Sequence, residues 1–132
     1  MIVKPVLGTG IDIVDNQRMQ QIMQRWKQRF LDRVFLPGEQ AYCNAKTLSH
    51  IHYAARFAAK EAVAKAFGTG IGSRLGWLDI EIVKDPMSGA PAIRLSDAGQ
   101  RLQKEYHATA VIVSLSHTRR FSVAHALLLG ND

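Results

Sequence analysis

The segment from Ser49 to Phe67 constrains the fold more than any other part of the chain, because it is rich in alanine and contains neither glycine nor proline. Alanine has the highest helix propensity of the amino acids, so this pattern predicts one long helix. Gly68 follows directly, as is typical of the end of a helix. A chain of 132 residues has room for one hydrophobic core, and we expect a single domain spanning residues 1–132.

Short apolar segments on both sides of this helix have the character of β-strands. The predicted strands are residues 6–14, 77–83, 92–95, 110–116 and 121–129. The Asp-Pro-Met-Ser-Gly sequence at 85–89 predicts a tight turn between the second and third strands, and residues 117–120 join the last two. Helices mixed with short strands and tight hairpins predict an α+β fold, in which an antiparallel sheet packs against helices.

Further helices are predicted on either side of the alanine-rich segment. Asp15 is a candidate N-cap of a helix whose apolar positions recur at spacings of three and four residues. These positions are Met19, Ile22, Met23, Trp26 and Phe30. The Pro-Gly pair at 37–38 interrupts the chain before a short predicted helix over 41–45, and Ser96 is the candidate N-cap of a helix that reaches Tyr106.

The charge balance favours an anionic partner. Seventeen Lys and Arg residues against eleven Asp and Glu give a net charge of +6, and much of the excess lies between Arg18 and Arg33. Nucleic acid, an acidic protein and a phosphorylated small molecule are all compatible with this charge. The single cysteine, Cys43, excludes an internal disulfide, and no apolar run is long enough to cross a bilayer. We therefore expect a cytoplasmic protein that does not enter membranes.

Glu61 is a candidate functional carboxylate because it lies among small and apolar residues of the predicted long helix. Residues three and four apart share a helix face. The neighbours of Glu61 on that face are Ala54, Phe57, Ala58, Ala64 and Lys65. One interpretation is an exposed pair with Lys65, worth about 0.2 to 0.5 kcal/mol to the helix. The other is a carboxylate directed into a site whose small walls admit a ligand.

Asp12 is the second candidate carboxylate. In the first predicted strand it shares a face with Gly8 and Gly10, whereas Ile11 and Ile13 lie on the other face. Asp12 either faces water or meets Glu61. If the two carboxylates converge, they repel each other by about 4 kcal/mol at about 4 Å and an effective dielectric constant near 20.

A cation is needed to offset such a repulsion. Lys65 is one candidate, and Mg²⁺ is the better one, because it binds one or two carboxylates and fills its remaining positions with water and phosphate oxygens. One cysteine and five scattered histidines give no tetrahedral ligand set for zinc.

Two other segments carry weaker signals. Gly68-Thr69-Gly70-Ile71-Gly72 ends the predicted long helix, and its backbone N–H groups are also able to contact phosphate. His117 ends the Ser-Leu-Ser-His-Thr sequence at 114–118, where it is either a polar strand end or a group for phosphate contact or proton transfer. Cys43 is expected to be a small packed residue.

Four motifs occur together in a specific order. They are Gly10–Val14, Arg56–Gly70, Trp77–Ile82 with Gly89 and Pro91, and Ser114–Thr118. In this order and spacing they resemble the holo-(acyl-carrier-protein) synthase family, the small 4′-phosphopantetheinyl transferases of bacterial fatty-acid synthesis. The resemblance covers nearly the whole chain, and the first two motifs are the specific ones.

The resemblance implies a reaction and its site residues. The reaction is the Mg²⁺-dependent transfer of 4′-phosphopantetheine from coenzyme A to a serine of apo acyl carrier protein, with release of adenosine 3′,5′-bisphosphate. Asp12 and Glu61 match the two metal-binding carboxylates, and Lys65 matches a lysine that contacts the pyrophosphate. Arg56 and His117, followed by Thr118, match positions near the 3′-phosphate. The coenzyme is further implied to lie along Gly68, Thr69 and Gly70, with its adenine near the turn at 85–89.

The same resemblance implies the partners. The carrier protein is acidic, and the implied docking residues are Arg18, Ile22, Arg25 and Arg29. The implied assembly is a homotrimer with each active site between neighbouring subunits. The general base stays open between Glu61, acting directly or through a metal-bound water, and His117.

Two alternative functions have weaker support. A basic nucleic-acid-binding domain fits the net charge, but Trp26 and Phe30 belong to the apolar stripe of a helix, and no helix-turn-helix, zinc or RNP pattern is present. We therefore expect no nucleic-acid partner. A non-catalytic interaction module, in which Asp12 and Glu61 are surface acids, is the second alternative.

Overall fold

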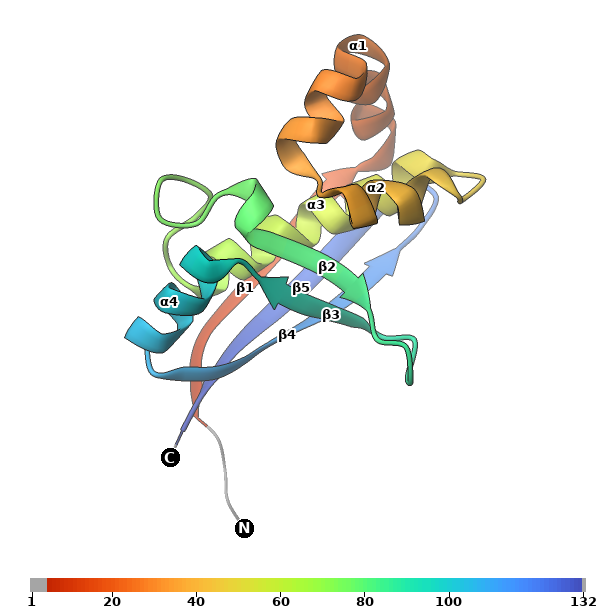
Figure 1. The fold of residues 1–132 in the computed structure, drawn as a ribbon. Coiled ribbons are helices and arrows are strands. Elements are labelled where there is room, and N and C mark those ends of the chain that lie inside the picture. The colour runs from red at the N-terminus through yellow and green to blue at the C-terminus, as the bar shows by residue number, and fades with distance from the viewer. Residues whose placement is uncertain (1–4, 132) are drawn as a thin grey trace.

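The computed structural model describes residues 5–131 and contains an α+β arrangement (Figure 1). In chain order the elements are β1 (Val6–Asp15), α1 (Asn16–Val34), α2 (Pro37–Asn44), α3 (Ser49–Ala66), η1 (Trp77–Asp79), β2 (Ile80–Lys84), β3 (Pro91–Leu95), α4 (Asp97–Glu105), β4 (Ala108–His117) and β5 (Phe121–Gly130). The predicted fold class is confirmed.

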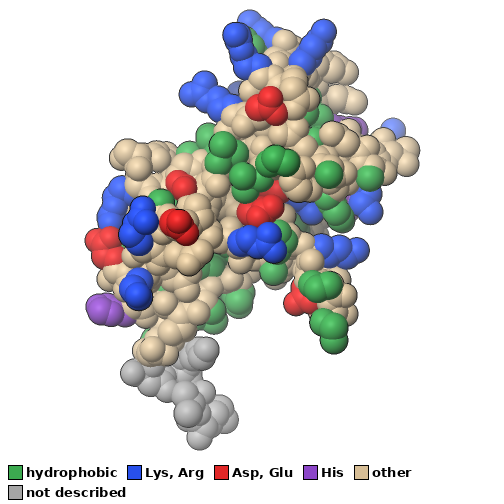
Figure 2. All heavy atoms as spheres, in the orientation of Figure 1, with side chains coloured by type: hydrophobic (Ala, Val, Ile, Leu, Met, Phe, Trp, Pro, Cys, Tyr) green, Lys and Arg blue, Asp and Glu red, His purple; other side chains and the backbone are tan. Residues whose placement is uncertain are grey.

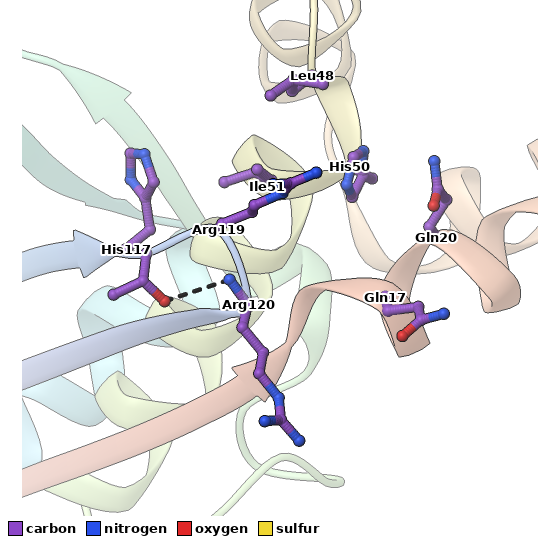
Figure 3. A pocket seen from close by; sticks show the side chains of 9 residues that line it. Gln17, Gln20, Leu48, His50, Ile51, His117, Arg119 and Arg120 are labelled. Carbon is purple, nitrogen blue, oxygen red and sulfur yellow. Dashed lines mark hydrogen bonds between the residues drawn. The ribbon is translucent and has the colours of Figure 1, made fainter.

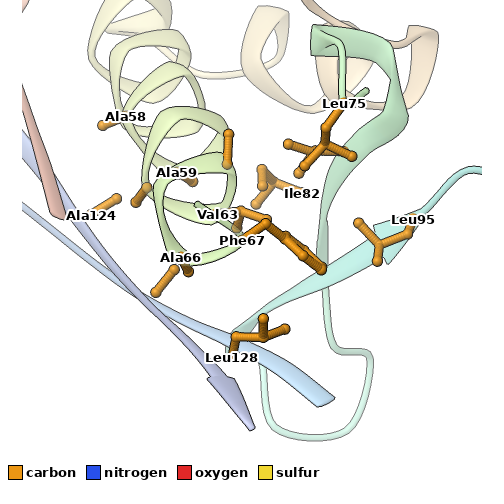
Figure 4. Close-up of a cluster of buried hydrophobic side chains, with 14 of the residues drawn as sticks. Ala58, Ala59, Val63, Ala66, Phe67, Leu75, Ile82, Leu95, Ala124 and Leu128 are labelled. Carbon is orange, nitrogen blue, oxygen red and sulfur yellow. The ribbon is translucent and has the colours of Figure 1, made fainter. Parts of the chain in front are cut away.

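Two antiparallel sheets enclose α3. One sheet has the strand order β1-β5-β4, and the other is the β2-β3 hairpin. Buried apolar side chains from α3 meet side chains of the hairpin on one side and of β5 on the other (Figure 4). In the close-up, Val63 of α3 and Phe67, the C-cap residue that follows this helix, face Leu95 of the hairpin and Leu128 of β5. The alanine-rich sequence suits this position, because small side chains let a helix pack closely on both sides.

Glycine in β1 sets how closely this strand approaches α3. A Cβ atom added to Gly10 would lie 1.9 Å from the carbonyl oxygen of Ala62, and one added to Gly8 would lie 1.9 Å from that of Ala66. No other residue fits at either position without moving the backbone. The glycine face of β1 is therefore the face that packs on the helix.

This arrangement assigns the faces of β1. The alternative in which Asp12 faces open water is wrong, because Asp12 shares the glycine face and is half-buried. Ile11 and Ile13 lie on the outer face of the sheet, with 63% and 61% of their surface exposed. An apolar outer face is unusual for a half-buried sheet in a monomer.

The structure corrects some predicted element boundaries. Residues 77–79 form a 3₁₀ turn rather than the start of the strand, and Leu78 is exposed. The predicted interruption at residues 37–38 is wrong, because α2 begins at Pro37 and ends at Asn44 instead of spanning 41–45; at this first helical position the missing N–H of proline costs no hydrogen bond.

The helix that follows β1 has the predicted cap and also a kink that the sequence pattern did not predict. Asp15 accepts hydrogen bonds from the N–H groups of Gln17 and Arg18 at 2.9 and 3.2 Å. Lys27 interrupts the helix with backbone angles of φ 50° and ψ −136°, which residues other than glycine rarely adopt. Trp26, expected on the buried stripe, is 47% exposed beside this kink. Across residues 5–131, no helix has both the length and the apolar character that a membrane span requires.

Candidate functional site

Strand β1 and helix α3 bring together three of the predicted site residues. Asp12 faces α3 because it shares the glycine face of β1, and it meets the last turns of the helix. Nζ of Lys65 lies 3.2 Å from Oδ1 of Asp12 and donates a second hydrogen bond to the carbonyl of Ile11 at 3.1 Å. Lys65 therefore pairs with Asp12 across the two elements rather than with Glu61 along the helix.

Glu61 is close enough to this pair for its titration to change. Burial, followed by the negative charge of Asp12, raises the pKa of the Glu61 carboxyl above its ordinary value, and Lys65 opposes the shift. Within residues 5–131 Glu61 makes no ion pair of its own. A carboxylate that is partly buried, unpaired and beside a second carboxylate is suited to bind a cation.

The donor set fits Mg²⁺. Asp12 and Glu61 offer hard oxygen donors, and no cluster of three or more Asp, Glu, His or Cys side chains occurs among the described residues. A metal ion held by two carboxylates keeps positions free for water and substrate oxygens, which is the coordination that Mg²⁺ usually has in proteins.

The glycine-rich segment lies directly beyond Lys65. Gly68 and Gly70 have positive φ angles of 77° and 63°, and their N–H groups bond to the carbonyls of Lys65 and Ala64, so they end α3. Thr69 donates its hydroxyl hydrogen bond to the carbonyl of Gly70 at 2.9 Å. The predicted structural role of this segment is confirmed, and the segment adjoins the Asp12-Glu61-Lys65 group.

Arg56 and His117 belong to a second group of side chains. Cζ of Arg56 lies 4.0 Å above the ring centre of Tyr42, and Nζ of Lys46 lies 4.8 Å from the same centre. The His52 ring is 6.0 Å from that of Tyr42 and 6.3 Å from that of His117. We call these five side chains the basic cluster.

The two groups do not meet within one chain. Arg56 precedes Glu61 by five residues on α3, which rotates the two side chains apart by roughly 140° around the helix axis. Arg56 is buried and packs on Tyr42 of α2, whereas Glu61 lies toward β1. The structure therefore divides the predicted site residues into two groups on one chain.

His117 and Thr118 also border a hollow with a volume of about 840 Å³ (Figure 3). It lies between the first turn of α1, the start of α3 and the β4-β5 turn. In Figure 3, Arg119 extends toward His50, whereas the guanidinium of Arg120 points away from it. The Thr118 hydroxyl accepts hydrogen bonds from the N–H groups of Arg120 and Phe121, so it helps to shape the turn.

Asn16 fixes that turn to α1. Its buried amide donates to the carbonyls of Thr118 and Arg119 at 3.1 and 3.2 Å, and its carbonyl accepts from Ser122 at 2.7 Å. Asn16 thus positions the turn that carries His117 and Thr118.

The predicted docking residues all lie on α1. Arg18, Arg25 and Arg29 are exposed, and Ile22 is half-buried between them. Ile22 and Arg29 line a hollow of about 500 Å³ together with Trp26. Figure 2 shows Lys and Arg side chains gathered over α1, at the top of the view.

A comparison with protein families identifies this combination of elements and motifs. The model of the 4′-phosphopantetheinyl transferase superfamily matches residues 8–124. The chain belongs to this superfamily. The resemblance predicted from the four sequence motifs is therefore confirmed, and the chain is a phosphopantetheinyl transferase by family.

Individual members of the superfamily match over almost their whole length. The chain is 43% identical to the holo-(acyl-carrier-protein) synthase of Syntrophus aciditrophicus over 125 residues, which cover 95% of this chain and 97% of that protein. The Helicobacter pylori holo-(acyl-carrier-protein) synthase, solved in complex with coenzyme A, has a TM-score of 0.80 at 36% identity, covering 91% of this chain and 98% of the other. The Neisseria meningitidis synthase has a TM-score of 0.87 at 30% identity, covering 94% and 98%.

Sequence reasoning missed several side chains that this transferase places beside the predicted ones. Tyr42, Lys46, His52 and Asn16 come from segments without a motif. One of them, His52, was predictable from helix geometry, because it precedes Arg56 by four residues and therefore lies on the same helix face. The remaining three depend on contacts between elements that are distant in sequence.

Proposed function

We propose that this chain transfers the 4′-phosphopantetheine group from coenzyme A to a serine of apo acyl carrier protein and releases adenosine 3′,5′-bisphosphate. The observation that carries the proposal is the convergence of Asp12, Glu61 and Lys65 in a member of the superfamily. Two carboxylates for a divalent cation and an adjacent lysine match the requirements of a pyrophosphate-containing substrate.

The residues of this group have distinct roles in the proposed reaction. Asp12 and Glu61 would hold Mg²⁺, which when bound polarises the attacked phosphate group and neutralises charge on the leaving phosphate. Lys65, already held by Asp12, would contact the pyrophosphate with the donors that Asp12 and Ile11 leave free. Gly68, Thr69 and Gly70 would line the path of the coenzyme beyond Lys65.

The chemical step forms one bond and breaks one. The serine oxygen of the carrier protein bonds to the phosphorus that bears the pantetheine arm, and the bond between this phosphorus and the bridging oxygen breaks. We assign the serine proton to Glu61, directly or through water, because Glu61 is the carboxylate of this group that makes no ion pair within residues 5–131. His117 is the alternative base, although within one chain it belongs to the other group.

The carrier protein would dock on α1. Arg18, Arg25 and Arg29 supply exposed positive charge for an acidic partner, and Ile22 supplies an apolar contact at the edge of a hollow. Charged contacts of this kind mainly steer the encounter and fix the orientation of the partner.

We further propose a homotrimer in which neighbouring copies complete each site. The outer face of the three-stranded sheet supports this, because Ile11, Ile13 and Ile112 expose large apolar side chains there. The division of the predicted site into two groups gives independent support. Asp12, Glu61 and Lys65 of one copy would face Arg56 and His117 of the next.

We also propose that residues 1–132 act as one transferase domain in the cytoplasm, where coenzyme A and carrier proteins are found. Helix α3 contributes to both clusters of buried apolar side chains, through Val63 in one and Tyr53 in the other, which supports one folding unit.

Burial raises the pKa of the Cys43 thiol to about 11, so this cysteine is an unreactive core residue.

The test of the proposed reaction is the intact mass of an apo acyl carrier protein after incubation with the chain, coenzyme A and Mg²⁺. The expected result is a mass gain of one phosphopantetheine group, which EDTA abolishes. No gain with several carrier proteins, when a control transferase modifies them, would refute the proposed function.

A further inference from the structure

The outer face of the three-stranded sheet has a histidine at its centre. β5 is the middle strand of this sheet, and His125 is exposed midway along it. In the strand register, His125 lies between Ile11 of β1 and Ser114 of β4. Residues opposite each other in neighbouring strands share a face, so the imidazole lies among the exposed isoleucine side chains of this sheet.

The imidazole has no charged neighbour on its part of the face. The side chains around it are Thr9, Ile11 and Ile13 from β1 and Ile112, Ser114 and Ser116 from β4, and none of these six carries a charge. Asp15 lies at the end of the face, where its carboxylate caps α1. Asp12 and Lys65 pair on the opposite side of the sheet, next to α3. Within residues 5–131 no carboxylate therefore pairs with His125.

A hydrogen bond holds the ring of His125 on this face. Its Nε2 atom lies 2.9 Å from Oγ1 of Thr9, a residue of β1 on the same face. Thr9 has no charge, so this bond does not favour the protonated ring in the way that a carboxylate would. The imidazole is therefore a polar group fixed within an apolar surface, and a charge on it would have no partner there.

The proposed homotrimer would cover this surface. A neutral imidazole that keeps its hydrogen bond is tolerated beneath an apolar surface, but a charged imidazole is costly to bury because it loses its water. Histidine is the side chain whose charge ordinarily changes between pH 5 and pH 8. In acid, a dissociated copy takes up a proton at His125 that the trimer excludes, so a falling pH favours dissociation.

We propose that His125 makes the assembly of this chain sensitive to pH, because neutral imidazoles allow the trimer to form and protonated imidazoles weaken it. This inference rests on the proposed homotrimer and deepens it. Each proposed active site is shared by two copies, so the same protonation lowers transferase activity in dilute protein. A higher protein concentration restores the activity, because assembly follows mass action.

The test is a dilution series followed by sedimentation velocity at pH 8 and at pH 5, the range in which histidine changes its charge. For the wild type, we expect the concentration at which half of the trimer dissociates to rise at least about tenfold in acid. The other histidines and Glu61 also titrate, so His125→Gln isolates the effect, and its midpoint should change less than about twofold. His107→Asn removes another exposed histidine and should behave like the wild type, since asparagine tolerates the positive φ of 56° at this position.

A permanent charge tests the same inference without acid. We expect His125→Lys to be monomeric at pH 8, because its charge would lie in the interface. A trimer of this variant as stable as that of the wild type, or an unchanged pH dependence in His125→Gln, would overturn the role of His125. A wild type that is monomeric at both pH values would overturn this inference together with the proposed assembly, whereas the transfer reaction is tested separately by the mass gain of the carrier protein. Circular dichroism checks that each protein is folded at both pH values.

Discussion

At the scale of single residues, Glu61 combines a cost in stability with the proposed chemistry. The pKa of its carboxyl in the folded chain lies above the ordinary value of 4.5, chiefly because of burial and then because of Asp12. Between pH 4.5 and the folded-state pKa, the Glu61 carboxyl therefore keeps its proton in the folded chain but has lost it in the unfolded chain. The contribution of Glu61 to stability is favourable below pH 4.5 and is lost as the pH rises through its folded-state pKa.

Replacing Glu61 should therefore separate activity from stability. We expect Glu61→Gln to slow transfer by about 10² to 10⁴-fold, because the variant lacks the carboxylate that we propose as metal ligand and base. At pH 7 without divalent metal, Glu61→Gln should melt at a higher temperature than the wild type, and the difference should disappear below pH 4.5. Thermal melts across this pH range check the second result, and a lower melting temperature for the variant at pH 7 would contradict it.

Gly10 shows how one residue positions the site. A Cβ atom at Gly10 would overlap the carbonyl of Ala62, so Gly10→Ala should push β1 away from α3 and destabilise the fold by about 3 kcal/mol. Gly72→Ala is the matched control, because its Cβ would meet no atom within 4 Å, and we expect a change below about 1 kcal/mol. Urea denaturation measures both. Equal effects of the two substitutions would show that the close approach of β1 and α3 does not matter.

At the scale of elements, a buried ion pair connects α2, α3 and the β2-β3 hairpin. Lys60 on α3 and Glu39 on α2 lie 2.8 Å apart and are both fully buried. Lys60 also donates to the carbonyls of Trp77 and Ile80, and Glu39 accepts from the N–H of Ile82 at 2.9 Å. These bonds satisfy both charges and fix the hairpin against the helix that carries Glu61.

Removing one partner of this pair leaves the other charge buried alone. We expect Lys60→Met to destabilise the fold by about 3 to 5 kcal/mol, whereas Lys104→Met on the exposed face of α4 should cost less than about 0.5 kcal/mol. Chemical denaturation of the two variants tests this. If Lys60→Met had the same free energy of unfolding as the wild type, the attraction between Lys60 and Glu39 would do no more than offset the cost of burying the two charges.

The proposed docking of the carrier protein on α1 gives a prediction about binding. Arg18→Ala and Arg25→Ala should each weaken binding of apo acyl carrier protein, more at low salt than at high salt, and should leave the affinity for coenzyme A unchanged. Arg101→Ala removes an exposed charge from α4 and should affect neither ligand. If the α1 variants instead lost affinity for coenzyme A and kept their affinity for the carrier protein, the proposal that the carrier protein docks on α1 would be wrong.

The elements show what the sequence is able to predict and what it is not. The alanine content of 49–67, the cap at Asp15 and the turn at 85–89 are local signals, and the structure contains the corresponding elements. The 3₁₀ turn at 77–79, the kink at Lys27 and the outward orientation of Ile13 depend on packing between distant segments. Asp12 and Glu61 were predictable as candidates from their local patterns. Lys46, in contrast, meets Arg56 only through their shared contact with the Tyr42 ring, and His52 was predictable only from its position four residues before Arg56 on the same helix face.

At the scale of the whole molecule, the open apolar face of the three-stranded sheet is the main unexplained surface of a single copy. We expect Ile13→Glu to convert the proposed trimer into monomers and to abolish transfer, because a charge would then lie in the interface. Met87→Glu, at an almost fully exposed turn residue, is the control and should leave the assembly intact. Light scattering after size-exclusion chromatography gives the masses. A wild-type monomer that is fully active would contradict the shared site.

The central claim is that Asp12 and Glu61, held together by the packing of β1 on α3, make this chain a Mg²⁺-dependent phosphopantetheinyl transferase. The most direct test is the rate of mass gain of apo acyl carrier protein, measured over a range of Mg²⁺ concentrations for the wild type and for Asp12→Asn. The account predicts that the wild type saturates with Mg²⁺, and that Asp12→Asn is folded but at least about 100-fold slower at the same Mg²⁺ concentration. Equal rates and equal Mg²⁺ dependence for the two proteins would contradict it.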